Sequence, residues 1–160
     1  MNEQQHETDL PIALALLRDN ELAIASLYEE YASLFPSEAG FWLGLVQEEQ
    51  QHAKWIEDLS HDLDTSGMPA GTRFSAAAIE TFAKYVHEQS ALAHEKPLTP
   101  KTALTTSYYI ETALIERRFF EQLSTRNPEV TQVMSQLKFS TEQHVKKVKD
   151  ALHQGHPGGY

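Results

Sequence analysis

The chain has 160 residues, of which 41% are hydrophobic and 22% charged, a balance that predicts one globular domain with a real core. Its formal net charge of -10 disfavours nucleic acid and membrane surfaces as partners, and no apolar run approaches the roughly 20 residues that span a membrane. The absence of cysteine excludes disulfides, thiol catalysis, iron–sulfur clusters and thiolate zinc sites, so any metal must be held by oxygen and imidazole nitrogen.

The first part of the chain is expected to form two long helices. Segment 1–9 is polar and lacks the basic and apolar parts of a signal peptide, so we expect a cytoplasmic location. Apolar residues at helical spacing predict a helix over 11–35, which Pro36 ends. A second helix is predicted over 37–62, because Ser at its start is a good N-cap and the breaker-rich stretch 65–71 follows.

The second part of the chain is expected to form two further long helices. Both are predicted to open with an N-cap residue followed by proline, at Thr99 for a helix ending near residue 124 and at Asn127 for a helix over 128–153. The long segment before them contains a shorter predicted helix over 75–91. The tail 154–160 is rich in glycine and is expected to be disordered.

The lengths of the connections predict how these helices are linked. Two short connections flank one long connection, which indicates two helical hairpins joined by a crossover. We therefore predict an all-α fold, an antiparallel four-helix bundle in one domain over 1–153, with the short extra helix in the crossover. Bundles of the ferritin-like type have this connectivity, whereas a simple up-and-down bundle needs short loops only.

Each long helix has an apolar stripe with a polar interruption near its middle. Residues that repeat at alternating steps of three and four face the core of a bundle. The interrupting residues, which lie at similar distances from the ends of their helices and so share one layer of the bundle, are Glu21, Glu49, His52, Glu111, Thr141 and His144. Glu49 and His52 lie three residues apart, so that one helix can offer both side chains to the same ion.

Several carboxylates in one buried layer need a compensating charge. Burying an unpaired carboxylate costs several kcal/mol, and like charges at close range disfavour each other's ionisation. A divalent metal ion removes both problems. A donor set of carboxylates and imidazoles without sulfur favours iron or manganese, with zinc as an alternative.

At these residues the chain resembles the rubrerythrin and ferritin-like di-iron carboxylate superfamily. The family has a glutamate on the first and third helices and Glu-x-x-His on the second and fourth, matched here by Glu21, Glu111 and the segment 49–52. Tyr28 corresponds to a tyrosine that lies near the metals in rubrerythrin. The resemblance covers residues 11–153. It implies a cofactor of one or two iron ions and an oxidoreductase acting on peroxide, dioxygen or ferrous iron, and it suggests a homodimer.

The roles implied by the resemblance can be given residue by residue. Glu49 would bridge two metals, Glu21 and Glu111 would be terminal ligands, and His52 and His144 would each bind one metal.

The sequence also departs from the family pattern. The fourth motif has Thr141 where the family has a second bridging glutamate, and the chain lacks the cysteines of a rubredoxin-type centre. The number of bound metal ions, one or two, therefore remains open. His144 could instead be a hydrogen-bonded core residue. The alternative function is a degenerate ferritin-like bundle without catalysis that acts as an interaction or structural module.

Overall fold

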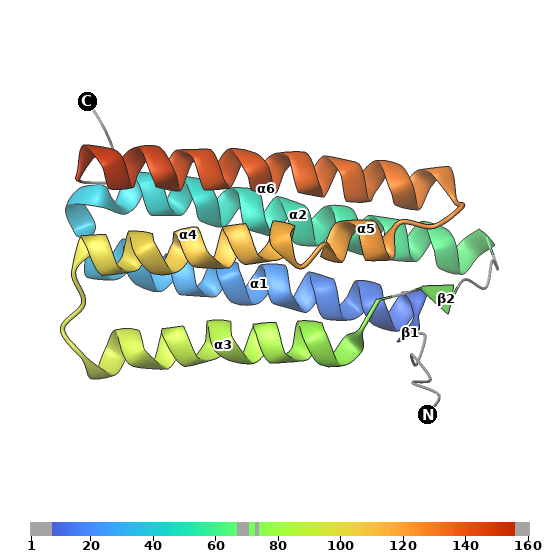
Figure 1. Ribbon diagram of the computed structural model, residues 1–160, viewed down its shortest axis with the longest axis horizontal. Helices are drawn as coiled ribbons and strands as arrows, with labels where there is room; N and C mark the ends of the chain where they lie inside the picture. Colours follow the sequence, from blue (N-terminus) through green and yellow to red (C-terminus); the bar gives the residue numbers. More distant parts are fainter. Residues whose placement is uncertain (1–7, 67–70, 73, 156–160) are drawn as a thin grey trace.

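The computed structural model describes residues 8–66, 71–72 and 74–155, and these residues are almost entirely helical (Figure 1). The all-α prediction is confirmed. The elements in chain order are β1 (Thr8–Asp9), α1 (Leu10–Leu34), the 3-10 helix η1 (Pro36–Glu38), α2 (Ala39–Ser66), β2 (Gly71–Thr72), α3 (Ala76–Glu95), α4 (Pro100–Glu116), α5 (Phe119–Leu123) and α6 (Pro128–Gln154). The two short strands pair antiparallel, with Thr8 opposite Thr72.

The long helices form a bundle of two antiparallel hairpins. Helices α1 and α2 make the first hairpin, and α4 with α5 runs antiparallel to α6 in the second (Figure 1). Helix α3 packs against α1 and returns the chain along the bundle, so that α4 begins at the end where α2 also begins. Helices α2 and α4 therefore run in the same direction.

Local sequence explains where the later helices begin. The side chains of Ser75, Thr99 and Asn127 accept hydrogen bonds from the backbone N–H groups at the start of α3, α4 and α6. Proline occupies the first position of both α4 and α6, where its missing N–H has no partner to lose. Gly155 ends α6 with a φ of 81°, a conformation that glycine adopts without steric cost.

The core consists of the apolar stripes that helical spacing predicts. The stripe residues buried on the long helices include Leu14, Leu17, Ile24, Tyr31, Trp42, Leu45, Ile56, Leu59, Leu63, Leu104, Phe119, Leu123, Val130, Met134, Leu137 and Val148. Phe35 and Tyr108 are half-buried and pack against this core. None of the described helices is both long and apolar enough to cross a membrane.

Three predicted boundaries were wrong. The third long helix was expected to be continuous to about residue 124, but it breaks between α4 and α5, where Arg118 has a φ of 57° and an exposed side chain. Helix α2 continues to Ser66 rather than ending at about Asp62. Helix α3 has 20 residues and is longer than the short helix expected. Gly155 is the last residue that the structure describes, so most of the tail predicted to be disordered lies outside the described residues.

Candidate metal centre

The polar residues that interrupt the apolar stripes lie together in the middle of the bundle. Glu21 comes from α1, Glu49 and His52 from α2, Glu111 from α4 and His144 from α6. All five side chains are at most 1% exposed. The shared layer predicted from helical spacing is therefore present, and it brings together all five residues expected to bind metal.

The first half of the cluster is built by α1 and α2. The Nδ1 atom of His52 lies 3.4 Å from Glu21 Oε2 and 3.2 Å from Glu49 Oε2. Because Glu49 and His52 are three residues apart on one helix, their side chains reach the same point. Glu21 approaches that point from the neighbouring helix.

The second half of the cluster is built around the other oxygen of Glu49. The Nδ1 atom of His144 lies 2.7 Å from Glu49 Oε1 and 3.5 Å from Glu111 Oε2. The imidazole rings of His52 and His144 stack with their centroids 5.1 Å apart and their planes at 17°. Glu49 thus presents one oxygen to each imidazole, with one further glutamate on either side.

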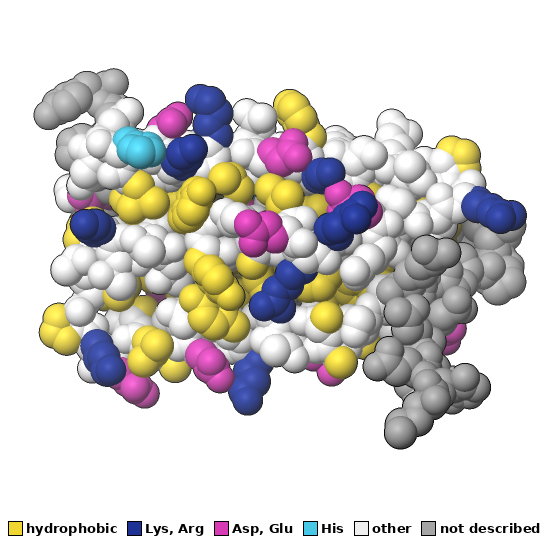
Figure 2. Space-filling view, in the orientation of Figure 1, with side chains coloured by type: hydrophobic (Ala, Val, Ile, Leu, Met, Phe, Trp, Pro, Cys, Tyr) yellow, Lys and Arg dark blue, Asp and Glu magenta, His cyan; other side chains and the backbone are white. Residues whose placement is uncertain are grey.

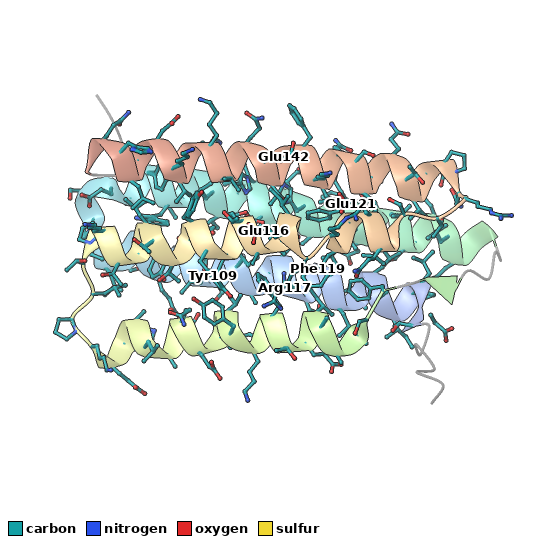
Figure 3. The ribbon with its side chains drawn as sticks, in the orientation of Figure 1. Tyr109, Glu116, Arg117, Phe119, Glu121 and Glu142 are labelled. Carbon is teal, nitrogen blue, oxygen red and sulfur yellow. The ribbon has the colours of Figure 1, made fainter. Side chains whose placement is uncertain are left out.

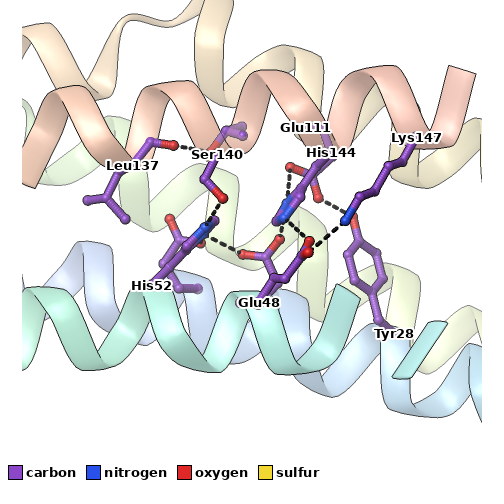
Figure 4. A network of polar contacts seen from close by, with 11 residues as sticks. Tyr28, Glu48, His52, Glu111, Leu137, Ser140, His144 and Lys147 are labelled. Atoms are coloured by element: carbon purple, nitrogen blue, oxygen red, sulfur yellow. Dashed lines mark hydrogen bonds and ion pairs between the residues drawn. The ribbon is translucent and has the colours of Figure 1, made fainter. Parts of the chain in front are cut away.

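The outer nitrogens of both histidines have polar partners of their own (Figure 4). His52 Nε2 lies 2.7 Å from the hydroxyl of Ser140, and His144 Nε2 lies 2.7 Å from Glu48 Oε2. The other oxygen of Glu48 accepts a hydrogen bond of 2.6 Å from Lys147. Such outer contacts hold a ring in the orientation that turns Nδ1 toward the carboxylates.

Sequence reasoning missed these outer partners. Ser140 and Glu48 each precede a residue of the predicted layer, so they lie at the edge of a stripe rather than on it. Lys147 is half exposed while it contacts Glu48. A search for polar residues next to the residues of the predicted layer would have identified Glu48 and Ser140.

Tyr28 and Thr141 lie beside the cluster but differ in what they contribute. The buried Tyr28 hydroxyl donates a hydrogen bond of 2.6 Å to Glu111 Oε1. The Thr141 hydroxyl donates to the carbonyl oxygen of Leu137 at 2.9 Å, one turn back on its own helix. Thr141 therefore occupies its predicted place without adding a carboxylate or pointing its hydroxyl hydrogen at the cluster.

Burial and mutual charge strongly perturb the acids and bases of the cluster. Burial and the nearby charge of Glu49 raise the pKa of Glu21 to about 8, and the same two causes raise the pKa of Glu111. The adjacent carboxylates of Glu21 and Glu49 outweigh burial and raise the pKa of His52 to about 10. The pKa of His144 is raised in the same way by Glu49 and Glu111.

Glu49 behaves in the opposite sense. Its burial opposes ionisation, but the adjacent imidazoles of His144 and His52 outweigh that effect and hold its pKa well below the usual range. The hydrogen bond with His144 also lowers the pKa of the outer carboxylate Glu48, to about 2. These shifts act together, since the lowered pKa of Glu49 and the raised pKa values of His52 and His144 favour a carboxylate paired with imidazolium groups.

The donor atoms of the cluster are only partly satisfied within the protein. One oxygen of Glu21, both oxygens of Glu49, one oxygen of Glu111 and both nitrogens of His144 are buried without a hydrogen bond of good geometry, although several have close ion-pair contacts. Buried polar atoms in proteins normally have a hydrogen-bond partner, so these atoms are available to bind a ligand. Glu49, His52 and His144 place ligand atoms within 4.8 Å of one another, so these three side chains could hold a metal ion.

Comparison with known proteins adds no relative. No protein-family model, curated protein or solved structure matches the chain.

Proposed function

We propose that the chain is a ferritin-like, rubrerythrin-type metal protein whose buried centre holds two iron ions and reacts with peroxide, dioxygen or ferrous iron. One observation carries the proposal: Glu49 presents one oxygen to His52 Nδ1 and the other to His144 Nδ1, and Glu21 and Glu111 lie on the outer sides. In this arrangement Glu49 could bridge two metal ions, and each ion would have its own imidazole and its own terminal carboxylate.

The directions of the helices support the ferritin-like part of the proposal. Helices α2 and α4 run in the same direction, and α3 provides the long return between them. A bundle with one long crossover has this order, whereas an up-and-down bundle would have α4 antiparallel to α2.

The donor set supports iron as the metal, with manganese or zinc as alternatives. Three carboxylates and two imidazoles, in a chain without cysteine, are hard and intermediate ligands suited to these ions. Glu21, Glu49 and His52 would hold one ion, and Glu111, Glu49 and His144 the other. When bound, iron supplies one-electron redox chemistry and polarises a small oxidant, while the protein supplies position and a dry pocket.

The chain's own residues prepare the site for that chemistry. Tyr28 holds the orientation of Glu111, and Ser140 and Glu48 hold the two imidazoles. The cluster is closed to water because its ligands are at most 1% exposed. The Thr141 hydroxyl donates to the carbonyl oxygen of Leu137, so this position, where the family has a second bridging glutamate, adds no carboxylate to the cluster.

The reaction with an oxidant tests the redox part of the proposal. Protein purified without chelator is loaded anaerobically with Fe(II), and its oxidation by peroxide and by dioxygen is followed optically. We expect faster oxidation than for Fe(II) free in the same buffer, and loss of the acceleration in Glu49→Ala. The variant Gln50→Ala, which changes an exposed neighbour on α2, is the matched control. Oxidation at the rate of free Fe(II) contradicts the proposal.

A second candidate is a metal-free bundle that serves as a structural or interaction module. The observation that favours it is the contact of Glu49 with both His52 and His144, whose pKa values are raised, because protonated imidazoles can compensate the buried charge without a metal. Under this alternative, anaerobic Fe(II) or Mn(II) does not raise the unfolding temperature, and purified protein contains no iron, manganese or zinc. Under the first proposal, both measurements are positive.

A further inference from the structure

The two imidazoles of the centre have chemically different partners on their outer nitrogens. His144 Nε2 lies 2.7 Å from a carboxylate oxygen of Glu48. His52 Nε2 lies at the same distance, 2.7 Å, from the hydroxyl oxygen of Ser140. An ionised carboxylate can only accept a hydrogen bond, whereas a hydroxyl can donate or accept one. The two outer contacts therefore do not constrain the two rings equally.

The outer contact decides which ring nitrogen is free to bind a metal ion. A neutral imidazole carries a hydrogen on one nitrogen and a lone pair on the other, and the lone pair binds the metal. Because Glu48 can only accept, it favours the form of His144 that has its lone pair on Nδ1, the nitrogen that faces the centre. Ser140 is compatible with either form of His52. An anion behind the ring also makes the imidazole a stronger ligand.

Lys147 reduces the effect of Glu48 without removing it. Its Nζ atom lies 2.6 Å from the other oxygen of Glu48. The two side chains are 48% and 40% exposed, so water screens this ion pair, whereas the side chain of His144 is 1% exposed. Outer partners of metal-binding histidines change metal affinity by about 10- to 100-fold, and with Lys147 present we expect a difference near the lower figure.

The two outer glutamates of the centre also differ in how firmly they are held. Glu111 Oε1 accepts the 2.6 Å hydrogen bond from Tyr28, which leaves Oε2 on the side of His144. Glu21 Oε2 contacts His52, but Glu21 Oε1 is buried and has no hydrogen-bond partner among the described residues. A ligand that is already held in its binding orientation loses less conformational freedom when a metal binds. This difference acts in the same direction as the outer contacts.

A surface cavity lies next to His52 and not next to His144. The cavity has a volume of about 260 Å³, and its lining residues on α2 and α6 include Trp55 and Gln136. The Trp55 ring stacks on His52 with the centroids 5.5 Å apart and the planes at 29°. Since His144 lies two turns further along α6 than Gln136, the cavity is beyond His52 rather than beside His144. One ring therefore separates the solvent in this cavity from His52.

We propose that the two halves of the centre hold metal unequally. The His144 half, which is His144, Glu111 and one oxygen of Glu49, binds the first and more tightly held ion. The His52 half, which is His52, Glu21 and the other oxygen of Glu49, binds an ion that exchanges with the solution. The proposal rests on the proposed function, because it needs a centre with two ions. It deepens that function by naming the half at which a divalent ion enters and leaves.

Charges at the surface provide a matched control for Glu48. Figure 2 shows acidic and basic side chains interspersed over α4 and α6, so their effects on the centre partly cancel. Glu142 is exposed, lies two residues from His144 and is labelled on α6 in Figure 3. No contact between Glu142 and either imidazole of the centre is found among the described residues. Glu142→Gln therefore removes a nearby carboxylate without removing an outer contact.

A zinc titration followed by nitrogen NMR tests which half fills first. Zn(II) has no redox chemistry and binds carboxylate and imidazole ligands. It is added in steps to the chelated full-length protein with isotope-labelled histidine, and the ring signals are assigned with His52→Gln and His144→Gln. The first equivalent should shift mainly the Nδ1 signal of His144, and the second should shift that of His52. A chelator added afterwards should remove the ion at His52 first.

The variant Glu48→Gln, which keeps the size of the side chain, tests the cause of the order. Repulsion between two bound ions weakens the second step in any such centre, so the NMR signals and not the calorimetric constants identify the first half to fill. In Glu48→Gln the first binding constant should fall by about 10-fold, and both histidine signals should shift together. Glu142→Gln should keep the native constants and the native order, and circular dichroism checks that both variants are folded.

The outcomes separate this proposal from the proposed function. Uptake of two zinc ions with both histidine signals shifting together, or with His52 first, overturns the unequal halves and leaves a two-metal centre standing. An order that is unchanged in Glu48→Gln also overturns the proposal, because the contact of Glu48 with His144 is its cause. No uptake of zinc by the native protein overturns both the unequal halves and the proposed function.

Discussion

The stability of the metal-free protein should fall steeply as the pH rises, because the cluster binds protons when it holds no metal. Burial and the neighbouring Glu49 raise the pKa of Glu21 from 4.5 to about 8. An acid whose pKa is higher in the folded state weakens that state once the pH passes its unfolded value. Since each unit between the two pKa values corresponds to about 1.4 kcal/mol, Glu21 alone removes up to about 5 kcal/mol of folding free energy between about pH 4.5 and pH 8.

Other members of the cluster also reduce the stability of the folded protein as the pH rises over this range. The pKa of His52 is raised from 6.5 to about 10, so the stability that its proton provides is complete below about pH 6.5 and disappears as the pH rises through 10. Glu111 and His144 also have raised pKa values. The lowered pKa of Glu49 acts only at acidic pH. Because the groups are coupled, their effects do not add, and we expect a total loss on the order of 5 kcal/mol from about pH 5 to about pH 9.

Urea denaturation followed by circular dichroism, with a chelator present at each pH, measures this loss. Glu21→Gln should flatten the profile, while Glu29→Gln, an exposed glutamate on the same helix, should leave it unchanged. Metal affinity should show the opposite trend and rise with pH, because binding displaces the same protons. A metal-free protein whose stability is constant or increases over this range would refute the assignment of raised pKa values to the cluster.

Four further changes have definite expected outcomes. Asn20 is fully buried with neither side-chain amide atom hydrogen-bonded, so Asn20→Leu should raise the free energy of unfolding by about 1 to 2 kcal/mol in urea denaturation. Arg118→Gly should raise it by about 1 kcal/mol, because φ is 57° at this position. Glu48→Ala should weaken metal binding by about 10- to 100-fold in chelator competition, while Gln47→Ala should not. Thr141→Glu should tighten metal binding in chelator competition, because it adds a carboxylate beside the centre, and exposed Gln143→Glu should not.

The helices and the buried layer follow from local sequence. Long amphipathic stripes with caps at Thr99 and Asn127 leave few alternative structures, and the period of a helix places Glu21, Glu49 and Glu111 on the inner face whatever the details of packing. The buried state of these glutamates was therefore predictable from spacing alone.

The features that the sequence did not predict depend on how the helices pack against one another. The contact of Glu48 with His144 joins α2 to α6. It depends on the shift of one helix relative to the other along their axes, which is set by packing along their whole length. The break at Arg118 was also missed, because neither proline nor glycine marks it; the backbone is held there by the burial of Phe119 and Phe120 just beyond. Helix α3 proved longer than expected, since its apolar residues continue to Ala93.

The number of metal ions held by the chain tests the central claim most directly. Anaerobic Fe(II) is added in steps to the chelated protein, and the mass of the native chain is measured at each step. The bridging position of Glu49 predicts uptake of two ions per chain and loss of both in Glu49→Ala. No uptake by the native protein, or uptake that is the same in Glu49→Ala, would contradict it.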